Sequence, residues 1–382
     1  MFDSQRVPLN SRQRQERQGK FPYYGAQGII DHIDGYIFDG RYILVAEDGE
    51  NLNSKKLPLA LFATGKFWVN NHAHILRGKP NVADDTYLLA CLNNADIKPF
   101  VTGAAQPKLS QANLRLIEIP LPPVPTQRRI ASILSAYDEL IENNQRRIRI
   151  LEEMARSLYR EWFVHFRYPG HESVPLVDSP LGQIPQGWEV KKLGDIAEDM
   201  RRNIPKGRLD EPQPYVGLEH IPRRSLALDS WEMASELGSN KLKFKKGEVL
   251  FGKIRPYFHK VSVAPFDGLC SADTIVIRAR QSEHYAIVVG CVSSDEFVAH
   301  ATATSNGSKM PRANWSVLKE QPIAIPTREV AHQFSAAVDP AIRQMQTLIF
   351  QTANLRLTRD LLLPRLLSGQ VELATDTPAI TA

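Results

Sequence analysis

The pattern of apolar and polar positions is helical over one unusually long stretch, residues 126–163. Apolar side chains return every three or four positions from Ile130 to Trp162, and most of the positions between them are polar or charged. This repeat predicts an amphipathic α-helix. The stretch has no Gly and no Pro, and a helix of this length would span roughly 57 Å. Such a long apolar stripe needs a partner helix to cover it.

A second helix with the same pattern is predicted at 327–364, and it provides that partner. The two stretches are related by a constant offset of 201 positions, as between Pro125 and Pro326. The same offset, without a gap, matches Lys108 with Lys309 ahead of the helices. The chain is therefore an internal repeat, in which a globular segment is followed each time by a long helix.

The two helices are expected to pair antiparallel about a pseudo-two-fold axis, with their apolar stripes facing each other. One stripe position, Asn144, is polar, and a single Asn in a helix seam often fixes the register. Its counterpart by offset, Met345, is apolar. We expect the second helix to end near Pro364, because proline cannot continue a helix. The positions predicted to form the pair are Ile130, Tyr137, Ile141, Asn144, Ile148, Leu151, Leu158, Val338, Ile342, Met345, Ile349 and Leu355.

Mixed patterns precede each helix. Short β-type runs broken by Asp-Gly pairs indicate strands and tight turns, including one strand over 65–78, and short helices are predicted at 86–94 and 284–294. The Pro- and Gly-rich segment 166–188 has the composition of a linker. The predicted fold class is α+β, with two mixed α/β domains separated by an antiparallel pair of long helices. The expected divisions are a first domain at 1–125, a helix and linker at 126–175, a second domain at 176–326, a second helix at 327–372 and a flexible tail at 373–382.

Composition and charge indicate which class of binding partner and which cellular compartment to expect. The net charge of +5 over 382 residues favours a nucleic acid or another acidic partner. No apolar run approaches the ~20 residues that a membrane-spanning helix needs, and the polar, basic N-terminus is unlike a secretion signal. The three cysteines are far apart without a CxxC motif, which indicates reduced thiols in a cytoplasmic protein.

Motifs for catalysis are absent from the sequence. It has no GxxxxGK[ST] phosphate loop, no GxGxxG cradle and no Asn/Asp-Pro-Pro-Tyr/Phe segment. His72 and His74 form an HxH pair that strand alternation would place on one face. That spacing is compatible with a pair of metal ligands, but polar histidines on the surface or in a loop are the simpler interpretation, and we expect no metal site. We also expect no catalytic residue.

Basic clusters with interleaved aromatic residues are the more informative pattern. Lys and Arg contacts to phosphates would supply affinity, whereas Arg, Asn, Gln and His at groove edges would read sequence. A solvated face that keeps the protein soluble is the alternative for any single residue. The residues expected to contact DNA are Arg12, Arg14, Arg17, Lys20, Lys55, Asn70, Asn71, His72, Lys108, Arg223, Arg224, Lys241, Lys243, Lys245, Lys246, Lys253, Arg255, Tyr257, Lys260, Lys309 and Arg312.

Several segments together resemble one known family, the specificity (S) subunit of type I restriction–modification systems. They are residues 22–52, 65–76, 119–172, 184–197, 244–256 and 361–373. The resemblance implies a non-catalytic subunit in which two target recognition domains each read one half of a bipartite, asymmetric DNA target. It also implies that the helices set the spacer and dock two methyltransferase subunits, to which nuclease subunits attach. S-adenosylmethionine would then belong to the methyltransferases, and ATP and magnesium to the nuclease subunits, in a phage-defence system. The alternative is a two-module protein-binding scaffold on a helical spacer, without DNA.

One departure from the family pattern concerns the start of the first domain. Members often open each recognition domain with a Trp-x-x-x-x-Leu-x-Asp segment, which the second domain has as Trp188, Leu193 and Asp195. The first domain lacks it. Either this domain is short at its start or the N-terminus is truncated.

Overall fold

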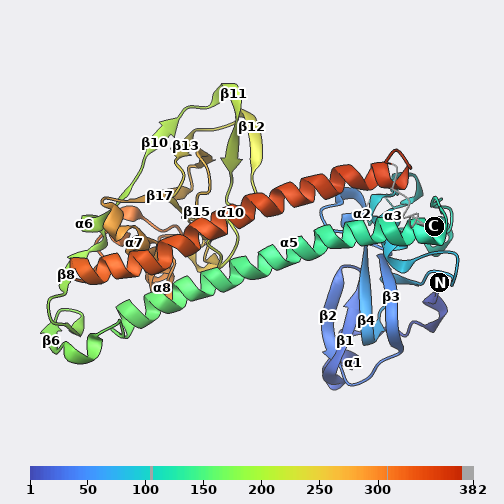
Figure 1. Cartoon of the computed structure of the whole chain (residues 1–382), viewed down its shortest axis with the longest axis horizontal. Coiled ribbons are helices and arrows are strands. Elements are labelled where there is room, and N and C mark those ends of the chain that lie inside the picture. Colours follow the sequence, from blue (N-terminus) through green and yellow to red (C-terminus); the bar gives the residue numbers. More distant parts are fainter. Residues whose placement is uncertain (104–105, 308, 372–382) are drawn as a thin grey trace, which may run out of the picture. The chain divides into compact units, whose positions relative to one another are not determined.

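The computed structural model describes residues 1–103, 106–307 and 309–371, and the chain divides into two compact units (Figure 1). Unit 1 comprises Met1–Glu139 and Arg356–Ala382, and unit 2 comprises Leu140–Leu355. Each of the two long helices has residues in both units. The tail expected at 373–382 lies outside the described residues.

Unit 1 is built on a five-stranded sheet in the order β2-β1-β4-β3-β5. The strands are β1 (Gln18–Gly25), β2 (Gly28–Ile33), β3 (Phe38–Ala46), β4 (Ala60–Val69) and β5 (Ala73–Leu76). The helices apart from the long pair are η1 (Asp3–Gln5), α1 (Ser11–Glu16), α2 (Asn51–Ser54), α3 (Asp85–Asn94), η2 (Lys98–Phe100) and α4 (Gln111–Leu114). The single strand predicted over 65–78 is wrong, because the chain turns at residues 70–72 and returns on the other side of β3 as β5.

Unit 2 contains a five-stranded sheet, β10-β13-β16-β11-β12, and a four-stranded sheet, β15-β14-β17-β9. Its strands are β6 (Leu176–Ser179), β7 (Gly182–Pro185), β8 (Glu189–Lys192), β9 (Ala197–Asp199), β10 (Arg202–Ile204), β11 (Gly207–Val216), β12 (Glu232–Leu237), β13 (Lys241–Phe244), β14 (Val249–Gly252), β15 (Val261–Val263), β16 (Gly268–Ser271), β17 (Thr274–Ala279) and β18 (Pro322–Ile325). Its short helices are η4 (His171–Ser173), α6 (Leu193–Ile196), η5 (Pro256–Phe258), η6 (Ser282–His284), α7 (Tyr285–Val292), α8 (Asp295–Ala303) and α9 (Trp315–Leu318).

The internal repeat predicted from the sequence is confirmed by the strand order. In unit 1, β1 forms a hairpin with β2 and pairs in parallel with β4, where Tyr23 faces Trp68. In unit 2, β11 forms a hairpin with β12 and pairs in parallel with β16, where Tyr215 faces Leu269. The continuous pair β3·β4 corresponds to two shorter pairs, β13·β16 and β14·β15, and β5 corresponds to β17. The two units therefore share one topology with different side chains.

The long helices are α5 (Val124–Tyr159), followed by a π-helical turn, η3 (Arg160–Val164), and α10 (Arg328–Leu367). Helix α10 continues past Pro364, so the predicted stop there is wrong. A proline near a helix end costs one internal hydrogen bond and some crowding. Here the next turn buries Leu366 beside Ile130 and Leu134 of α5, and this burial offsets that cost.

The helix pair is antiparallel in each unit. In unit 1, Ile130 and Leu134 of α5 pack near the C-terminal end of α10, and Asp138 is ion-paired with Arg359 at 2.6 Å. In unit 2, Ile148 packs against Leu348 and Ile349. Among the predicted pairing positions, those that are buried are Ile130, Ile141, Asn144, Ile148, Val338, Ile342, Met345 and Ile349, and those that are partly buried are Tyr137, Leu151, Leu158 and Leu355.

The segment with linker composition, 166–188, is ordered. Strands β6 and β7 form a hairpin within it, and Tyr168, Ile184 and Trp188 are buried in the main core of unit 2. Composition alone suggested a linker because Pro and Gly are frequent in it, but three apolar side chains are enough to hold it against the core.

Candidate nucleic-acid interface

Six of the predicted DNA-contacting residues come together in unit 2. Backbone bridges join Arg223 to Lys260 and Ile254 to Arg312, so three chain segments meet around the turn that follows β14. We call this group the loop cluster; its members are Arg223, Lys253, Arg255, Tyr257, Lys260 and Arg312.

The turn at the centre of the loop cluster has an unusual backbone. Arg255 and His259 both have positive φ angles, 50° and 51°, and they flank the 3-10 turn η5. Non-glycine residues in this conformation carry strain that the surrounding structure must hold. Between them, Tyr257 is 51% exposed, and its ring meets that of Phe258 edge to face with the ring centroids 4.9 Å apart. The turn thus presents an aromatic side chain outward.

The cations of the loop cluster are not equivalent. Lys253 donates to the carbonyl of Ala272 at 2.8 Å, Lys260 donates to the carbonyl of Leu218, and Arg312 is ion-paired with Asp273. Burial lowers the pKa of both lysines below the ordinary 10.5. These three side chains are thus engaged within the fold, which leaves the two guanidinium groups described next.

Arg223 and Arg255 are the cations of the cluster with unused donors. The Arg223 guanidinium lies 4.0 Å from the Phe258 ring centroid and that of Arg255 lies 5.9 Å from it. Neither guanidinium has a hydrogen bond or an ion pair within residues 1–103, 106–307 and 309–371. Stacking on an aromatic face leaves the edge of a guanidinium able to donate.

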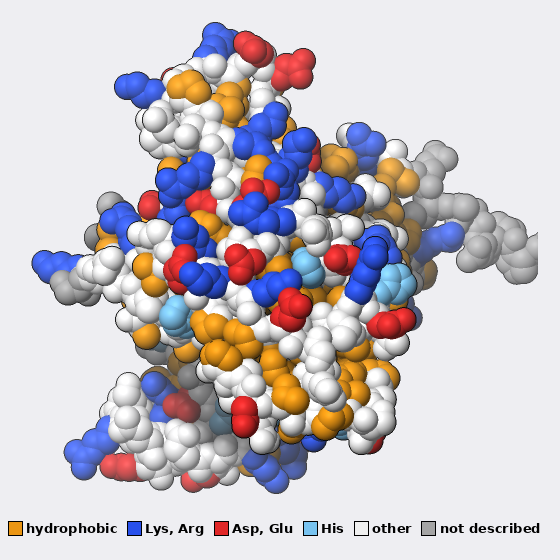
Figure 2. Space-filling view, turned by 90° about the vertical axis from the view of Figure 1, so that its left-hand side faces the viewer, with side chains coloured by type: hydrophobic (Ala, Val, Ile, Leu, Met, Phe, Trp, Pro, Cys, Tyr) orange, Lys and Arg blue, Asp and Glu red, His pale blue; other side chains and the backbone are white. Residues whose placement is uncertain are grey.

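A second basic group lies along β13 and the turn after it, and we call Lys241, Lys243, Lys245 and Lys246 the strand cluster. Lys241 lies over the Tyr215 ring at 5.0 Å. The other three are exposed, and their ammonium groups have no acidic partner in the described part of the chain. The turn is held instead by its backbone, because Lys245 N–H donates to Glu248 and Lys246 N–H donates to Asp267. Figure 2 shows Lys and Arg side chains gathered over the upper part of one face.

The arginine-rich start of unit 1 is largely neutralised. Arg14 pairs with Asp31 at 3.0 Å and lies over Tyr23. Arg17 pairs in the same way with an acid, Asp34, at 2.8 Å, and lies over Trp68. Arg12 forms an exposed pair with Glu16, four residues on. Lys20 is exposed and lies over the Phe21 ring at 5.4 Å. Only Lys20 of these four has a side chain without an acidic partner among the described residues.

The remaining candidates of unit 1 are mostly tied into the fold. Asn70 is 7% exposed and accepts from His72 N–H, whose ring lies 2.5 Å from Asp48. Lys108 is paired with Glu47 at 3.2 Å. Lys55 donates to the carbonyl of Ala95 at 2.8 Å, and Asn71 is exposed.

The position of His74 contradicts both interpretations of the HxH pair, a pair of metal ligands on one face and two histidines on the surface or in a loop. It is fully buried, with Nδ1 2.7 Å from Asp3 Oδ2 and Nε2 donating to the Leu109 carbonyl at 2.7 Å. It is thus neither a surface histidine nor on a face shared with His72, which lies in the turn before β5. No group of three or more His, Cys, Asp or Glu in the described ranges could hold a metal ion.

The structure also corrects the pairing of Lys108 with Lys309. Lys108 exchanges two backbone hydrogen bonds with Thr102, and Arg312 exchanges the same two bonds with Asn306. Short helices follow three residues later in each unit, α4 and α9, with N-caps Ser110 and Asn314. Arg312 is therefore the counterpart of Lys108, three residues beyond the constant offset. The connection from the short helix to the long one spans 115–123 in unit 1 and 319–327 in unit 2, where it includes β18.

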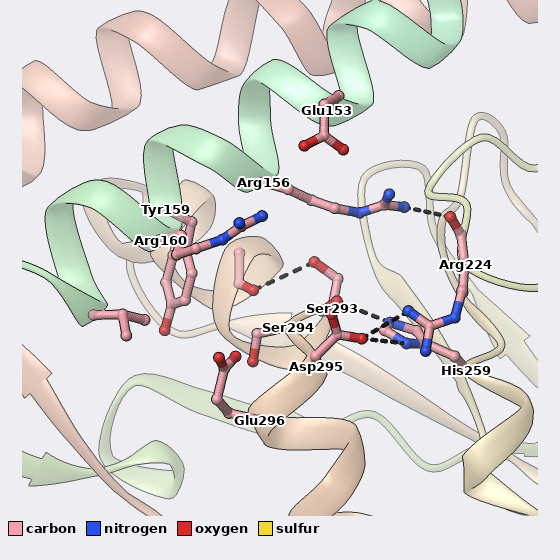
Figure 3. A pocket seen from close by; sticks show the side chains of 12 residues that line it. Glu153, Arg156, Tyr159, Arg160, Arg224, His259, Ser293, Ser294, Asp295 and Glu296 are labelled. Atoms are coloured by element: carbon pink, nitrogen blue, oxygen red, sulfur yellow. Dashed lines mark hydrogen bonds and ion pairs between the residues drawn. The ribbon is translucent and has the colours of Figure 1, made fainter.

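A polar cavity of about 210 Å³ in unit 2 separates α5 from the start of α8 (Figure 3). Arg156 reaches across to the carbonyl of Arg224, and Asp295 lies between the Arg224 guanidinium, at 2.8 Å, and His259. His259 donates to the carbonyl of Ser293 at 2.9 Å. Burial lowers the pKa of His259 below 6.5, so its ring is neutral near pH 7. Arg224, expected to contact DNA, is thus committed to this network.

The sequence did not reveal the roles of two further residues, Glu152 and Arg156. Both lie on α5 and hold the segment after β11, since Glu152 accepts from Ser225 and from Ala227 N–H. Glu152 is only 5% exposed. The available signal was its spacing, four residues after Ile148 and three before Ala155, which places this acid within the apolar stripe.

Comparison with known proteins places the chain in a family. Residues 1–153 and 185–352 match the model of the type I restriction modification DNA specificity domain. The match covers most of the chain, which therefore belongs to this family of DNA-specificity proteins. No helix in the described residues is long and apolar enough to span a membrane.

Individual relatives agree with this assignment. The type I restriction enzyme MjaIX specificity subunit of Methanocaldococcus jannaschii is 27% identical over 285 residues, which are 72% of this chain and 65% of that protein. The EcoDI specificity subunit of Escherichia coli is 22% identical over 361 residues, 89% of this chain and 79% of that one. The crystal structure of a type I restriction–modification S subunit from M. genitalium shares the fold, with a TM-score of 0.60 over 98% of this chain and 96% of that chain, at 14% identity.

Proposed function

We propose that this chain is the non-catalytic subunit that gives a type I restriction–modification complex its DNA sequence specificity. Each globular domain reads one half of a bipartite target. The observation that carries this proposal is one strand topology built twice with different side chains. At equivalent places after β3 and β14, unit 1 has Glu47 and Asp48, whereas unit 2 has Lys253 and Ile254. Since base readout depends on side-chain chemistry, the two half-sites differ and the target is asymmetric.

The two long helices set the distance between the half-sites. Their antiparallel packing in each unit supports this role, because a paired helix is stiffer than a flexible connection. We expect the half-sites to lie about one DNA turn apart, ~34–36 Å between centres.

The outer faces of the helices dock two methyltransferase subunits. Apolar side chains away from the helix seam support this assignment: Leu140, Ile150, Met154, Phe350, Leu357 and Leu361 are each more than 40% exposed. The methyltransferases bind S-adenosylmethionine and flip the target adenine, since a base inside a duplex cannot be reached. Nuclease subunits attach through them and use ATP and magnesium. This chain binds none of these cofactors itself.

Methylation mapping of whole genomes tests the proposal. Cells that express the methyltransferase with this chain should acquire methylated adenines in one bipartite motif, and cells without the chain should not. Exchanging residues 1–125 for the same domain of another S subunit should change one half-site only. A change in both half-sites, or methylation that does not depend on the chain, would contradict the proposal.

A further inference from the structure

The internal repeat places Gly49 of unit 1 and Arg255 of unit 2 at equivalent positions. Gly49 N–H donates to the Pro107 carbonyl at 3.1 Å, and Arg255 N–H donates to the Pro311 carbonyl at 2.8 Å. Both residues have positive φ, 108° and 50°. Each opens a loop that closes on another positive-φ residue, Lys55 in unit 1 and His259 in unit 2.

An arginine at this position is informative because glycine is the residue that the backbone prefers there. A side chain in the left-handed region clashes with the neighbouring backbone, which glycine avoids. Unit 1 uses glycine, beside open space. Unit 2 tolerates the strained residue because the far end of the loop is held by two hydrogen bonds. The His259 ring donates to the Ser293 carbonyl, and Arg224 N–H donates to the His259 carbonyl at 2.8 Å. Strained residues of this kind concentrate at functional sites.

Among the described residues, the Arg255 side chain makes no hydrogen bond or ion pair that would hold the loop in place. Its five N–H donors have no acceptor there, and its nearest aromatic neighbour is Phe258 at 5.9 Å. Arg223 stacks closer on the same ring, so the two guanidinium groups share one aromatic support. The lysines on either side, Lys253 and Lys260, already donate to internal carbonyls.

We propose that Arg255 reads a guanine in the major groove of the half-site bound by unit 2. Guanine presents two adjacent acceptors, O6 and N7, that match the two parallel donors of a guanidinium. Tyr257, exposed beside it, contacts the neighbouring base or sugar. This assignment rests on the proposed function, and it separates one base-reading residue from the phosphate-binding lysines of the strand cluster.

The test uses the chain assembled with its methyltransferase subunits. First, the exchange of residues 1–125 identifies which half-site belongs to unit 2. Then the dissociation constant is measured for Arg255→Gly, Arg255→Lys and Lys245→Ala on the target and on duplexes in which each base pair of that half-site is replaced. Thermal denaturation of each variant is recorded in parallel.

Arg255→Gly should keep or raise the melting temperature, because it introduces the residue type that unit 1 has at the equivalent position, Gly49. It should weaken binding to the target about ten- to hundred-fold and abolish discrimination at one G·C pair. Arg255→Lys should discriminate less than wild type but more than Arg255→Gly, because an ammonium group can donate to guanine but lacks the paired donors of a guanidinium. It should keep affinity for unrelated DNA. Lys245→Ala should weaken binding to all duplexes alike.

Three results would overturn the inference. Discrimination retained by Arg255→Gly would exclude base reading, because that variant has no side-chain donor. An equal loss on all duplexes would make Arg255 a phosphate contact, and a lowered melting temperature in Arg255→Gly would make it a structural residue. If the wild-type complex has no bipartite target at all, the proposed function fails with it, whereas an unaltered target in the variants removes only the role of Arg255.

Discussion

Glu152 of the long helix α5 accepts a hydrogen bond from the Ser225 hydroxyl at 2.6 Å, and the same oxygen accepts from Ala227 N–H at 2.9 Å. Glu152 as a whole is only 5% exposed. It joins the helix to the loop between β11 and β12 within unit 2. Under the proposed function this contact fixes how the recognition domain sits on the helix that measures the spacer.

Loss of the Glu152 carboxylate should destabilise unit 2. Glu152→Ala removes the acceptor of the Ser225 hydroxyl and leaves the buried Ala227 N–H only its longer bond to Ser225 Oγ, at 3.2 Å. We expect the free energy of unfolding to fall by about 1–3 kcal/mol. The matched control is Glu142→Ala on the same helix, where an exposed pair with Arg146 contributes only about 0.3–0.5 kcal/mol. Chemical denaturation measures both. Equal losses in the two variants would mean that the buried contact contributes nothing beyond a surface pair.

Gly290 in helix α7 should not tolerate even a methyl group. A Cβ at this position would lie 2.3 Å from the ring of Tyr159. In an ordinary helix interior, glycine to alanine stabilises by roughly 0.5–1 kcal/mol. Here Gly290→Ala should instead lower the melting temperature by several degrees, because the ring and the helix must move apart.

The control for that experiment is Gly238→Ala, at an exposed glycine with no atom within 4 Å of the added methyl. It should leave the melting temperature nearly unchanged. A stabilised Gly290→Ala variant would show that α7 and α5 can separate at no cost.

Low pH should lower the stability of unit 1 because it protonates Asp3. Burial by itself raises the pKa of Asp3, but the hydrogen bonds from His74 and Ile75 N–H outweigh it, and the net pKa is below the ordinary 3.8. A carboxyl with a depressed folded-state pKa contributes stability above its unfolded pKa and loses it as pH falls through the folded value. Asp3→Asn should therefore be less stable than wild type at pH 7.

That stability difference should narrow as pH falls below about 3.8, where wild-type Asp3 also becomes neutral. Unfolding curves of the two proteins at a series of pH values measure it. A difference that stays constant from pH 7 to pH 3 would show that the charge of Asp3 does not contribute.

Lys245 should contribute to affinity without contributing to sequence choice. Its side chain is exposed in the strand cluster, and each phosphate contact adds about 0.9 to the slope of log affinity against log salt. Lys245→Ala should reduce that slope by about one for target and unrelated duplexes alike. Lys319→Ala, whose ammonium is 3.8 Å from Glu320, is the control. A slope that stays at the wild-type value would place Lys245 in solvent.

Lengthening both helices should widen the unspecified spacer. One heptad inserted after Ile148 and another after Leu348, which pack together, keeps the apolar stripes in phase and adds about 10 Å of helix. Methylation mapping should then find half-sites separated by about three more base pairs, at ~3.4 Å each. A heptad in α5 alone should disrupt pairing and activity. An unchanged spacer in the doubly extended protein would exclude the helices as the ruler.

Periodicity predicted the long helices well because their apolar spacing reports a single burial direction over many turns. The pattern found α5 within a few residues of its observed bounds, and it placed Asn144 in the buried seam. It failed at Pro364, where the packing of Leu366 offsets the local preference. It also could not show that Glu152 is buried with partners, since those partners, Ser225 and Ala227, lie more than 70 residues away.

The sequence by itself determined the repeat, the helix pair and the family, because these depend on order and spacing along the chain. Only the tertiary structure decided which charged side chains remain available. Arg14 and Lys253 are chemically as suited to DNA as Arg255, yet the first is paired with Asp31 and the second with a backbone carbonyl. Such pairing depends on distances of about 3 Å between residues far apart in the chain, and these follow from the packed fold alone.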